Sequence, residues 1–259
     1  MRMMKKVLGV VTVLALSVSL LAGCGSTAAS PVSSAASTAA ESTTSAVVSE
    51  TTSAAADENA AAAAQLLNDL TGSYQELWPV ILADEYKQTW LDGCTALVGE
   101  DNAEAAFEKL SSMVTGDVYG EDAVKAYANG GGAYFCGFTN DLATLTFDGE
   151  TSTISGTDKD GNELFSHPYH YIGMEPVRGL YEFESDDADS GEFTYFFLAP
   201  DTSAETYHIE FRYGSDADAL SQYDAGDYAY WLASGISTDC DQTMIDNCIE
   251  LFCTENLAG

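Results

Sequence analysis

Basic residues are scarce in this chain, which has nine Lys and Arg against 41 Asp and Glu among its 259 residues. The formal net charge at pH 7 is −32. A surface of this sign repels nucleic-acid phosphates and anionic lipid headgroups, so we exclude binding to nucleic acid. The same field draws cations towards the protein, although acidity also serves solubility alone.

Motifs for common enzymatic chemistry are missing as well. The chain has no Gly-rich phosphate loop, no G-x-S-x-G turn and no H-E-x-x-H helix motif. Two acidic segments, residues 158–161 and 186–191, lack the spacing of a calcium-binding loop, so we expect ordinary hairpin turns there. We therefore expect a binding protein and not an enzyme.

The one long hydrophobic run lies at the N-terminus. Residues 7–20 are apolar and follow a basic start, but they are shorter than the roughly 20 residues that cross a bilayer. The run ends in Leu21-Ala22-Gly23-Cys24, which resembles the bacterial lipobox. We therefore predict a lipoprotein signal peptide over residues 1–23 and lipidation of Cys24.

The segment after the lipobox is almost entirely Ser, Thr and Ala, which bury too little apolar surface to fold. Residues 24–56 are therefore predicted to be a flexible tether, and residues 57–259 a single folded domain. This domain would lie on the extracytoplasmic face of a bacterial cell membrane and touch it only through the lipid anchor.

Five cysteines remain after Cys24. An exported protein would allow two disulfides with one thiol left over, but spacing alone does not fix the pairing. A pair of Cys240 with Cys248 or Cys253 would close the C-terminal segment, whereas an anaerobic source would keep all five reduced. The wide spacing does not resemble a zinc knuckle, so we assign Cys94, Cys136 and the other three a structural role.

Apolar periodicity changes along the domain from helical to alternating. The predicted helices cover residues 57–70, 84–98, 102–113, 121–128, 216–232 and 241–254. The predicted strands cover residues 133–138, 142–147, 152–157, 163–173, 179–184, 192–199 and 206–213. Consecutive hairpins of six to eight strands close into an up-and-down antiparallel β-barrel, so we predict a mostly β fold with helices flanking the barrel at both ends of the chain.

The segment 193–214 reads as two strands around a turn and carries one of only three histidines. In its second strand His208 and Glu210 are two residues apart, so the alternation of a strand places them on one face. Glu205 lies close by in the sequence. An imidazole and carboxylates are ligands that zinc accepts, which makes His208, Glu210 and Glu205 the predicted metal ligands.

This hairpin resembles the metal-binding hairpin of the ZinT (YodA) family of extracytoplasmic zinc-binding proteins. Leu198-Ala199-Pro200 matches the turn and Tyr207-His208-Ile209 matches the second strand. The resemblance implies a calycin or lipocalin-like barrel, zinc as the bound ion and delivery to a metal-uptake transporter. Of the family's three histidines only His208 is present, because Thr206 replaces the first of the pair and the third aligns near Phe196.

Further segments resemble the family in a consistent order. They are residues 70–79 near the start of the barrel, 166–173 in a Tyr-rich strand and 220–235 in an aromatic segment before the last helix. His167 and His170 in the second of these lie three apart, so they face opposite sides of a strand and cannot both join one site.

Two functions follow from these observations. The first is a surface lipoprotein that binds a divalent metal ion through His208 and nearby carboxylates. The alternative is a barrel that has lost its metal and takes a small organic ligand or a partner protein, which Phe196 favours because it makes the pocket more apolar.

Overall fold

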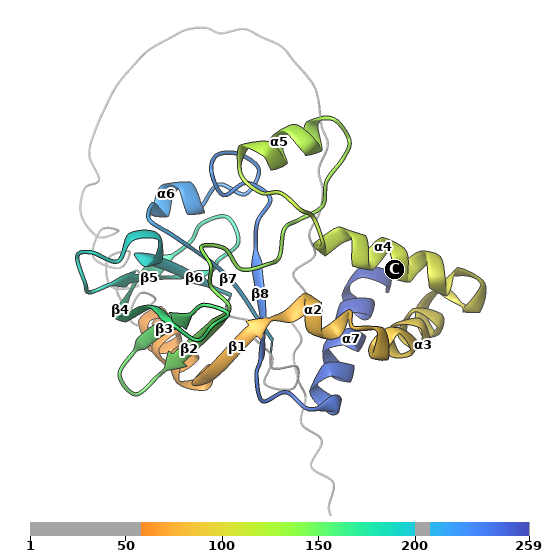
Figure 1. Ribbon diagram of the computed structural model, residues 1–259, viewed down its shortest axis with the longest axis horizontal. Coiled ribbons are helices and arrows are strands. Elements are labelled where there is room, and N and C mark those ends of the chain that lie inside the picture. Colours follow the sequence, from red (N-terminus) through yellow and green to blue (C-terminus); the bar gives the residue numbers. More distant parts are fainter. Residues whose placement is uncertain (1–57, 200–207, 259) are drawn as a thin grey trace, which may run out of the picture. The chain divides into compact units, whose positions relative to one another are not determined.

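A computed structural model describes residues 58–199 and 208–258 (Figure 1). The chain divides into two units, residues 1–43 and 44–259, and all described residues belong to the second. The predicted signal peptide, the tether and Cys24 lie outside the described residues and stay predictions.

The strands close into an antiparallel barrel in which each strand pairs with its neighbours in sequence and β8 pairs with β1. This confirms the predicted barrel with flanking helices. The eight strands are β1 (Gly72–Glu76), β2 (Thr144–Asp148), β3 (Thr153–Thr157), β4 (Glu163–Met174), β5 (Tyr181–Ser185), β6 (Tyr195–Leu198), β7 (His208–Gly214) and β8 (Ala233–Ser237).

Side chains alternate along these strands as the sequence predicts. In β2, for example, Leu145 and Phe147 are buried while Thr144 and Thr146 are partly exposed. The β2–β3 turn is held by Asp148, whose carboxylate accepts hydrogen bonds from the backbone of the next residues. The acidic segment 158–161 forms a turn of the same kind, in agreement with the predicted hairpin.

Large aromatic side chains fill the barrel. Among them are Phe147, Phe183, Phe196, Phe211 and Tyr213, each exposed by 1% or less. The ring of Phe196 lies 5.3 Å from that of Tyr213 and 6.4 Å from that of Phe211. Because these rings fill the interior that the strands enclose, the described barrel has a packed core and not an open cavity at this level.

Helices form a second core beside the barrel (Figure 1). Helices α2 (Leu77–Ile81), α3 (Lys87–Val98), α4 (Ala103–Val114) and α7 (Gln242–Leu257) contribute to this core. Helices α5 (Glu121–Ala128) and α6 (Ala217–Leu220) lie outside it. Helices α3 and α7 pack against each other, and Trp90 of α3 is fully buried there. The helical residues 58–69 instead place Ala63, Leu66 and Leu67 in the barrel core, at the spacing of one helix face.

Two predicted elements are wrong. The predicted helix 216–232 is helical only over α6, and the chain then turns, with Tyr230 at a positive φ of 54°. The predicted strand 133–138 makes only isolated bridges through Phe135 to Thr115 and Trp231. In both segments tertiary hydrogen bonds override local preference, because the backbone of Phe135 pairs with Tyr230 and Leu232.

Strands β1 and β8 are absent from the strands predicted from the sequence. Strand β1 is short and buries only Tyr74. The residues of β8, Ala233–Ser237, are buried on both faces except at the last position, so no alternation of polar and apolar residues marks them. No helix in residues 58–199 or 208–258 is long and apolar enough to cross a membrane.

Candidate functional site

Strand β7 presents two faces with different surroundings. Ile209, Phe211 and Tyr213 point into the barrel core and are fully buried. His208 and Glu210 alternate with them, are partly exposed, and therefore lie together on the outer face. The sequence places these two residues on one face, and the structure shows that this face points away from the barrel interior.

A small pocket of about 60 Å³ opens where this face meets the helices. It lies between β7, α2 and α7. Its lining residues are Leu77, Trp78, Ile81, His208, Glu210, Cys248, Leu251, Phe252 and Glu255. We call it the β7–α7 pocket.

The β7–α7 pocket collects acidic groups. Burial raises the pKa of the Cys248 thiol to about 12, and the nearby Cys240, Glu210 and Glu255 add to this rise in that order. Burial and then Glu210 raise the pKa of Cys136 to about 12 in the same way. No Lys or Arg lines the pocket, and His208 is the basic side chain in its walls.

Trp78 forms the apolar wall of this pocket. Its indole Nε1 is buried and has no hydrogen-bond partner of normal geometry, although it lies near enough to the Cys136 thiol to lower the pKa of that group. The ring of Trp78 also meets Phe252 of α7 edge to face at 4.6 Å. This aromatic contact packs α7 against α2, which follows directly after strand β1.

Four side chains of the pocket are of types that bind metal ions: His208, Glu210, Cys248 and Glu255. Across the residues that the structure describes, however, no three His, Cys, Asp or Glu side chains are close enough together to hold an ion as they stand. Binding of an ion here therefore requires the side chains of β7 and α7 to draw together.

The remaining predicted ligands are not brought to this pocket. Glu205 and Thr206 lie outside the described residues. Phe196 pairs with Tyr213 across the β6–β7 ladder and points into the barrel core, so it lies on the opposite face from His208. The side chain at position 196 therefore does not lie beside His208 in this structure.

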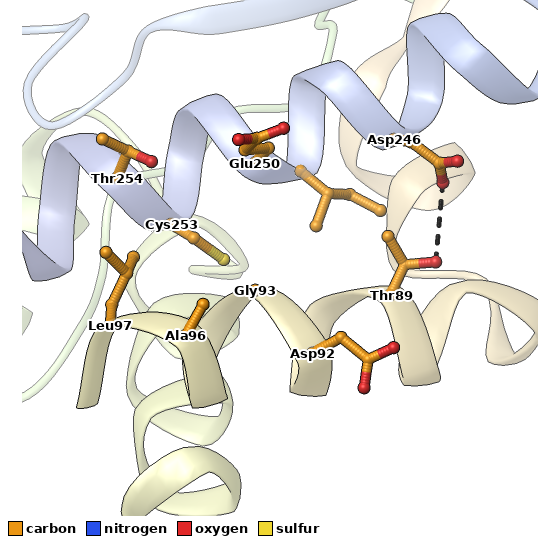
Figure 2. Close-up of a pocket in the computed structure, with 10 residues that line it drawn as sticks. Thr89, Asp92, Gly93, Ala96, Leu97, Asp246, Glu250, Cys253 and Thr254 are labelled. Carbon is orange, nitrogen blue, oxygen red and sulfur yellow. Dashed lines mark hydrogen bonds between the residues drawn. The ribbon is translucent and has the colours of Figure 1, made fainter. Parts of the chain in front are cut away.

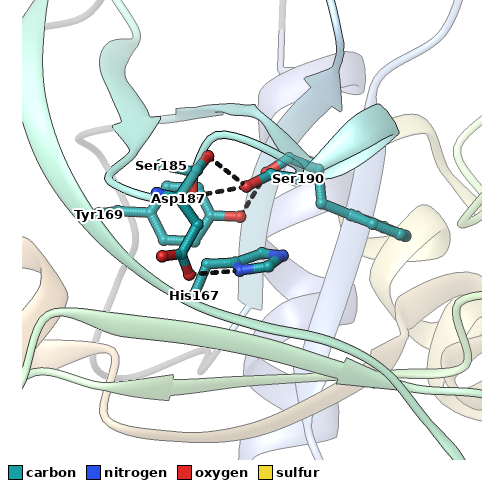
Figure 3. A network of polar contacts seen from close by, with 6 residues as sticks. His167, Tyr169, Ser185, Asp187 and Ser190 are labelled. Atoms are coloured by element: carbon teal, nitrogen blue, oxygen red, sulfur yellow. Dashed lines mark hydrogen bonds and ion pairs between the residues drawn. The ribbon is translucent and has the colours of Figure 1, made fainter.

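The other two histidines lie on β4, and each forms a hydrogen bond with a different aspartate. His167 Nδ1 lies 2.8 Å from Asp187 Oδ2, and His170 Nδ1 lies 2.7 Å from Asp186 Oδ1. Figure 3 shows His167 and Asp187 beside the buried Ser190 in the turn after β5. The two histidines face opposite sides of the strand, as the sequence predicts, and neither lines the β7–α7 pocket.

The five cysteines of the described chain are unpaired thiols in this structure. Cys253 lies against Cys94 and not against Cys240, with 4.0 Å between the sulfur atoms. Cys248 faces the β7–α7 pocket.

Sequence reasoning missed the contribution of α7 to the pocket. Cys248 and Glu255 are seven residues apart, which is two helical turns, so they lie along one side of α7. This spacing is the only sequence signal that relates them. Nothing in the local pattern connects them to His208, which lies 40 or more residues earlier in the chain.

The fold and pocket define a class: an eight-stranded antiparallel barrel with an acidic, His-containing pocket between its outer face and a C-terminal helix. No protein-family model matches the chain, and no curated protein sequence matches it.

Two solved structures resemble the chain at low identity. One is the Zn(II)-bound ZinT-like domain of Streptococcus pneumoniae AdcA, with 16% identity, a TM-score of 0.45, and coverage of 71% of this chain and 89% of that one. The other is Zn(II)-bound AdcA from the same organism, with 13% identity, a TM-score of 0.43, and coverage of 72% of this chain and 35% of that one. Any site must therefore be argued from the chain's own residues.

Proposed function

We propose that this protein binds a divalent metal ion, most readily zinc, in the β7–α7 pocket and carries it without chemical change. One observation supports the proposal most directly: His208 and Glu210 share the outer face of β7 and meet Cys248 and Glu255 of α7 around one cavity. Imidazole nitrogen, thiolate sulfur and carboxylate oxygen are the donors that zinc prefers.

The electrostatics of the pocket favour the same ion. Burial first, then Cys240, Glu210 and Glu255, disfavour ionisation of the Cys248 thiol. A divalent cation has the opposite effect, because it stabilises carboxylates and a thiolate at once. Zinc binding would thus make these groups ligands of one cation and would draw α7 towards β7.

The proposed role is capture of the ion at the cell surface for delivery to an uptake system. The predicted lipid anchor at Cys24 and the tether over residues 24–56 would hold the domain at the extracytoplasmic face. The resemblance of the β6–β7 hairpin to the ZinT family supports the same role, as does the high negative charge, which concentrates cations around the domain.

The alternative, a small organic ligand inside the barrel, loses its main support. It depends on Phe196 making a pocket apolar, but Phe196 is fully buried among other rings and fills the barrel core.

The decisive experiment is a zinc titration by calorimetry on the chain from residue 25 onward, under reducing conditions. We expect one site, with affinity weakened more than about 100-fold by His208→Ala, since loss of an outer-shell partner alone costs 10–100-fold. Glu210→Gln should weaken it as well. His170→Ala is the matched control, because His170 is a half-exposed histidine on β4 that does not line the pocket. Absence of zinc binding near neutral pH, or equal affinities for His208→Ala and the parent chain, would contradict the proposal.

A further inference from the structure

We propose that Cys94 and Cys253 form a disulfide bond in the exported protein, which ties α7 to α3. The bond would close a loop between two residues 159 positions apart in the sequence. It would make the contact between α3 and α7 in the second core covalent.

The geometry singles out this pair. The sulfur atoms of Cys94 and Cys253 lie 4.0 Å apart, and both residues are buried where α3 packs on α7. A disulfide has a sulfur–sulfur length of about 2.05 Å, so each side chain must move by roughly 1 Å to bond. In the described part of the chain, no other two cysteines have sulfur atoms in contact at this distance.

Gly93 makes this close approach sterically feasible. A Cβ atom at position 93 would lie 3.2 Å from the sulfur of Cys253, which is tighter than ordinary contact. A glycine at this point of α3 therefore leaves room for the Cys253 side chain to reach across the helix interface towards Cys94.

A groove of about 470 Å³ between α3 and α7 leads to Cys253. Figure 2 shows the Cys253 side chain pointing across the groove towards α3, beside Gly93. Asp92, Asp246 and Glu250 line the same groove and make it acidic.

Burial sets when the bond forms. Burial raises the pKa of Cys253 to about 12, and it raises the pKa of Cys94 as well, so few thiolates are present in the folded protein at neutral pH. Because the thiolate is the attacking species, oxidation is slow once α7 has docked and fast before it. The bond is therefore expected to form during folding after export.

The chemistry requires an external disulfide, either a thiol–disulfide oxidoreductase or an oxidised low-molecular-weight thiol. The Cys253 thiolate attacks this disulfide, forms a mixed disulfide and releases one thiolate. The Cys94 thiolate then attacks the Cys253 sulfur and releases the second. The two protein thiols lose two protons and two electrons, and the oxidant becomes two thiols.

The bond has a consequence for the β7–α7 pocket. Cys253 lies on α7 between Cys248 and Glu255, which line that pocket, so the disulfide would hold both near β7. This consequence rests on the proposed function, whereas the disulfide itself rests only on the α3–α7 geometry.

The test uses the full chain produced with its own leader in a bacterial host and purified from membranes in detergent without reductant. Free thiols are blocked before digestion, and the peptides are analysed by mass spectrometry without reduction. We expect a cross-linked peptide that contains Cys94 and Cys253. It should disappear in Cys94→Ala and persist in Cys136→Ala, a variant of an equally buried thiol outside the α3–α7 contact.

Stability gives a second readout. For a loop of 159 residues, reduction should lower the Tm of the parent chain on the order of 10 °C, and it should leave the Tm of Cys94→Ala unchanged. If the thiol-blocking reagent modifies all five cysteines without prior reduction, even in protein refolded with oxidised glutathione, then no disulfide has formed and the proposal is overturned. So would a cross-link from Cys253 to any other cysteine. A cross-link found in a chain that binds no zinc would uphold the disulfide and reject only the cation pocket.

Discussion

Phe196 and His208 lie on opposite faces of the β6–β7 hairpin. The register pairs Phe196 with Tyr213, so its ring points into the barrel with those of Tyr213 and Phe211. His208 is an odd number of residues from Tyr213 and faces α2 and α7. A zinc site that includes His208 must therefore recruit its other ligands from outside the barrel.

The first prediction follows from this relationship. Phe196→His should not tighten zinc binding, because the new imidazole would enter the aromatic core and not the β7–α7 pocket. It should destabilise the fold by about 3 kcal/mol or more, since it removes buried apolar volume and buries a polar ring without a designed partner. Denaturant unfolding and zinc titration measure the two effects. Phe196→Leu is the control for lost volume, and a gain in zinc affinity would disprove the assigned register.

The second prediction concerns protons. Burial first, and then nearby acidic groups, raise the pKa of Cys248 to about 12, so this thiol is protonated at pH 7.5 before an ion binds. A metal-bound thiol is deprotonated, so binding should release about one proton through Cys248 and should tighten as pH rises. Calorimetry in two buffers of different ionisation enthalpy counts the released protons. Cys248→Ser should release about one fewer, and an unchanged count would remove Cys248 from the ligand set.

The third prediction is loss of stability at high pH. Burial holds the pKa of Cys136 and Cys248 at about 12, above the value of about 8.5 for an exposed thiol. The unfolded chain therefore binds fewer protons than the folded one between these values, and unfolding becomes easier as pH rises through that window. The stabilisation is complete below about pH 8.5 and is lost by about pH 12.

The expected slope is about 1.4 kcal/mol per pH unit for each thiol. Free energies of unfolding measured from pH 8 to pH 11 in the presence of reductant give this slope. Cys248→Ala should reduce the slope by about 1.4 kcal/mol per pH unit, the contribution of one thiol. Removal of a half-exposed acid such as Asp186 should leave the slope unchanged. A stability independent of pH over this range would show that the thiols are not buried as described.

The fourth prediction concerns Arg212, a fully buried residue whose guanidinium donates to the backbone carbonyls of Leu220, Gln222 and Tyr228. Arg212→Lys should destabilise the fold by about 3 kcal/mol, because a lysine lacks the planar fork that reaches several acceptors and leaves carbonyls without donors. Thermal or denaturant unfolding measures this loss.

Arg178 supplies the matched control for that substitution. Its guanidinium lies over the same Tyr223 ring, at 4.5 Å compared with 4.3 Å for Arg212, but its hydrogen bond to Tyr134 is exposed. Arg178→Lys should cost no more than about 1 kcal/mol. Equal losses for the two substitutions would show that stacking on Tyr223, and not the carbonyl network, makes Arg212 important.

Local sequence patterns predicted the elements that have one solvent-exposed face and one buried face. Alternation located β2 to β7, and Asp241 before an apolar run located α7, where its side chain accepts a hydrogen bond from the backbone of Met244. The same patterns failed for β1, for β8, for residues 133–138 and for residues 221–232. Strand β1 buries only Tyr74, and β8 is buried on both faces. The other two segments take their conformation from tertiary hydrogen bonds, such as those of the Phe135 backbone and the Arg212 side chain.

By itself, the sequence determined that His208 and Glu210 share one face of a strand in a strongly acidic barrel protein. Only the tertiary structure decided that this face points outwards, that Cys248 and Glu255 meet it, and that Cys253 lies against Cys94. The physical reason is that alternation along a strand fixes which residues share a face. Closure of the barrel and packing of the helices determine which of the two faces points into the barrel. Those choices bring together residues that are far apart in the sequence. His208 and Glu255 line one pocket, and Cys94 and Cys253 are 159 positions apart, and no local pattern records either relationship.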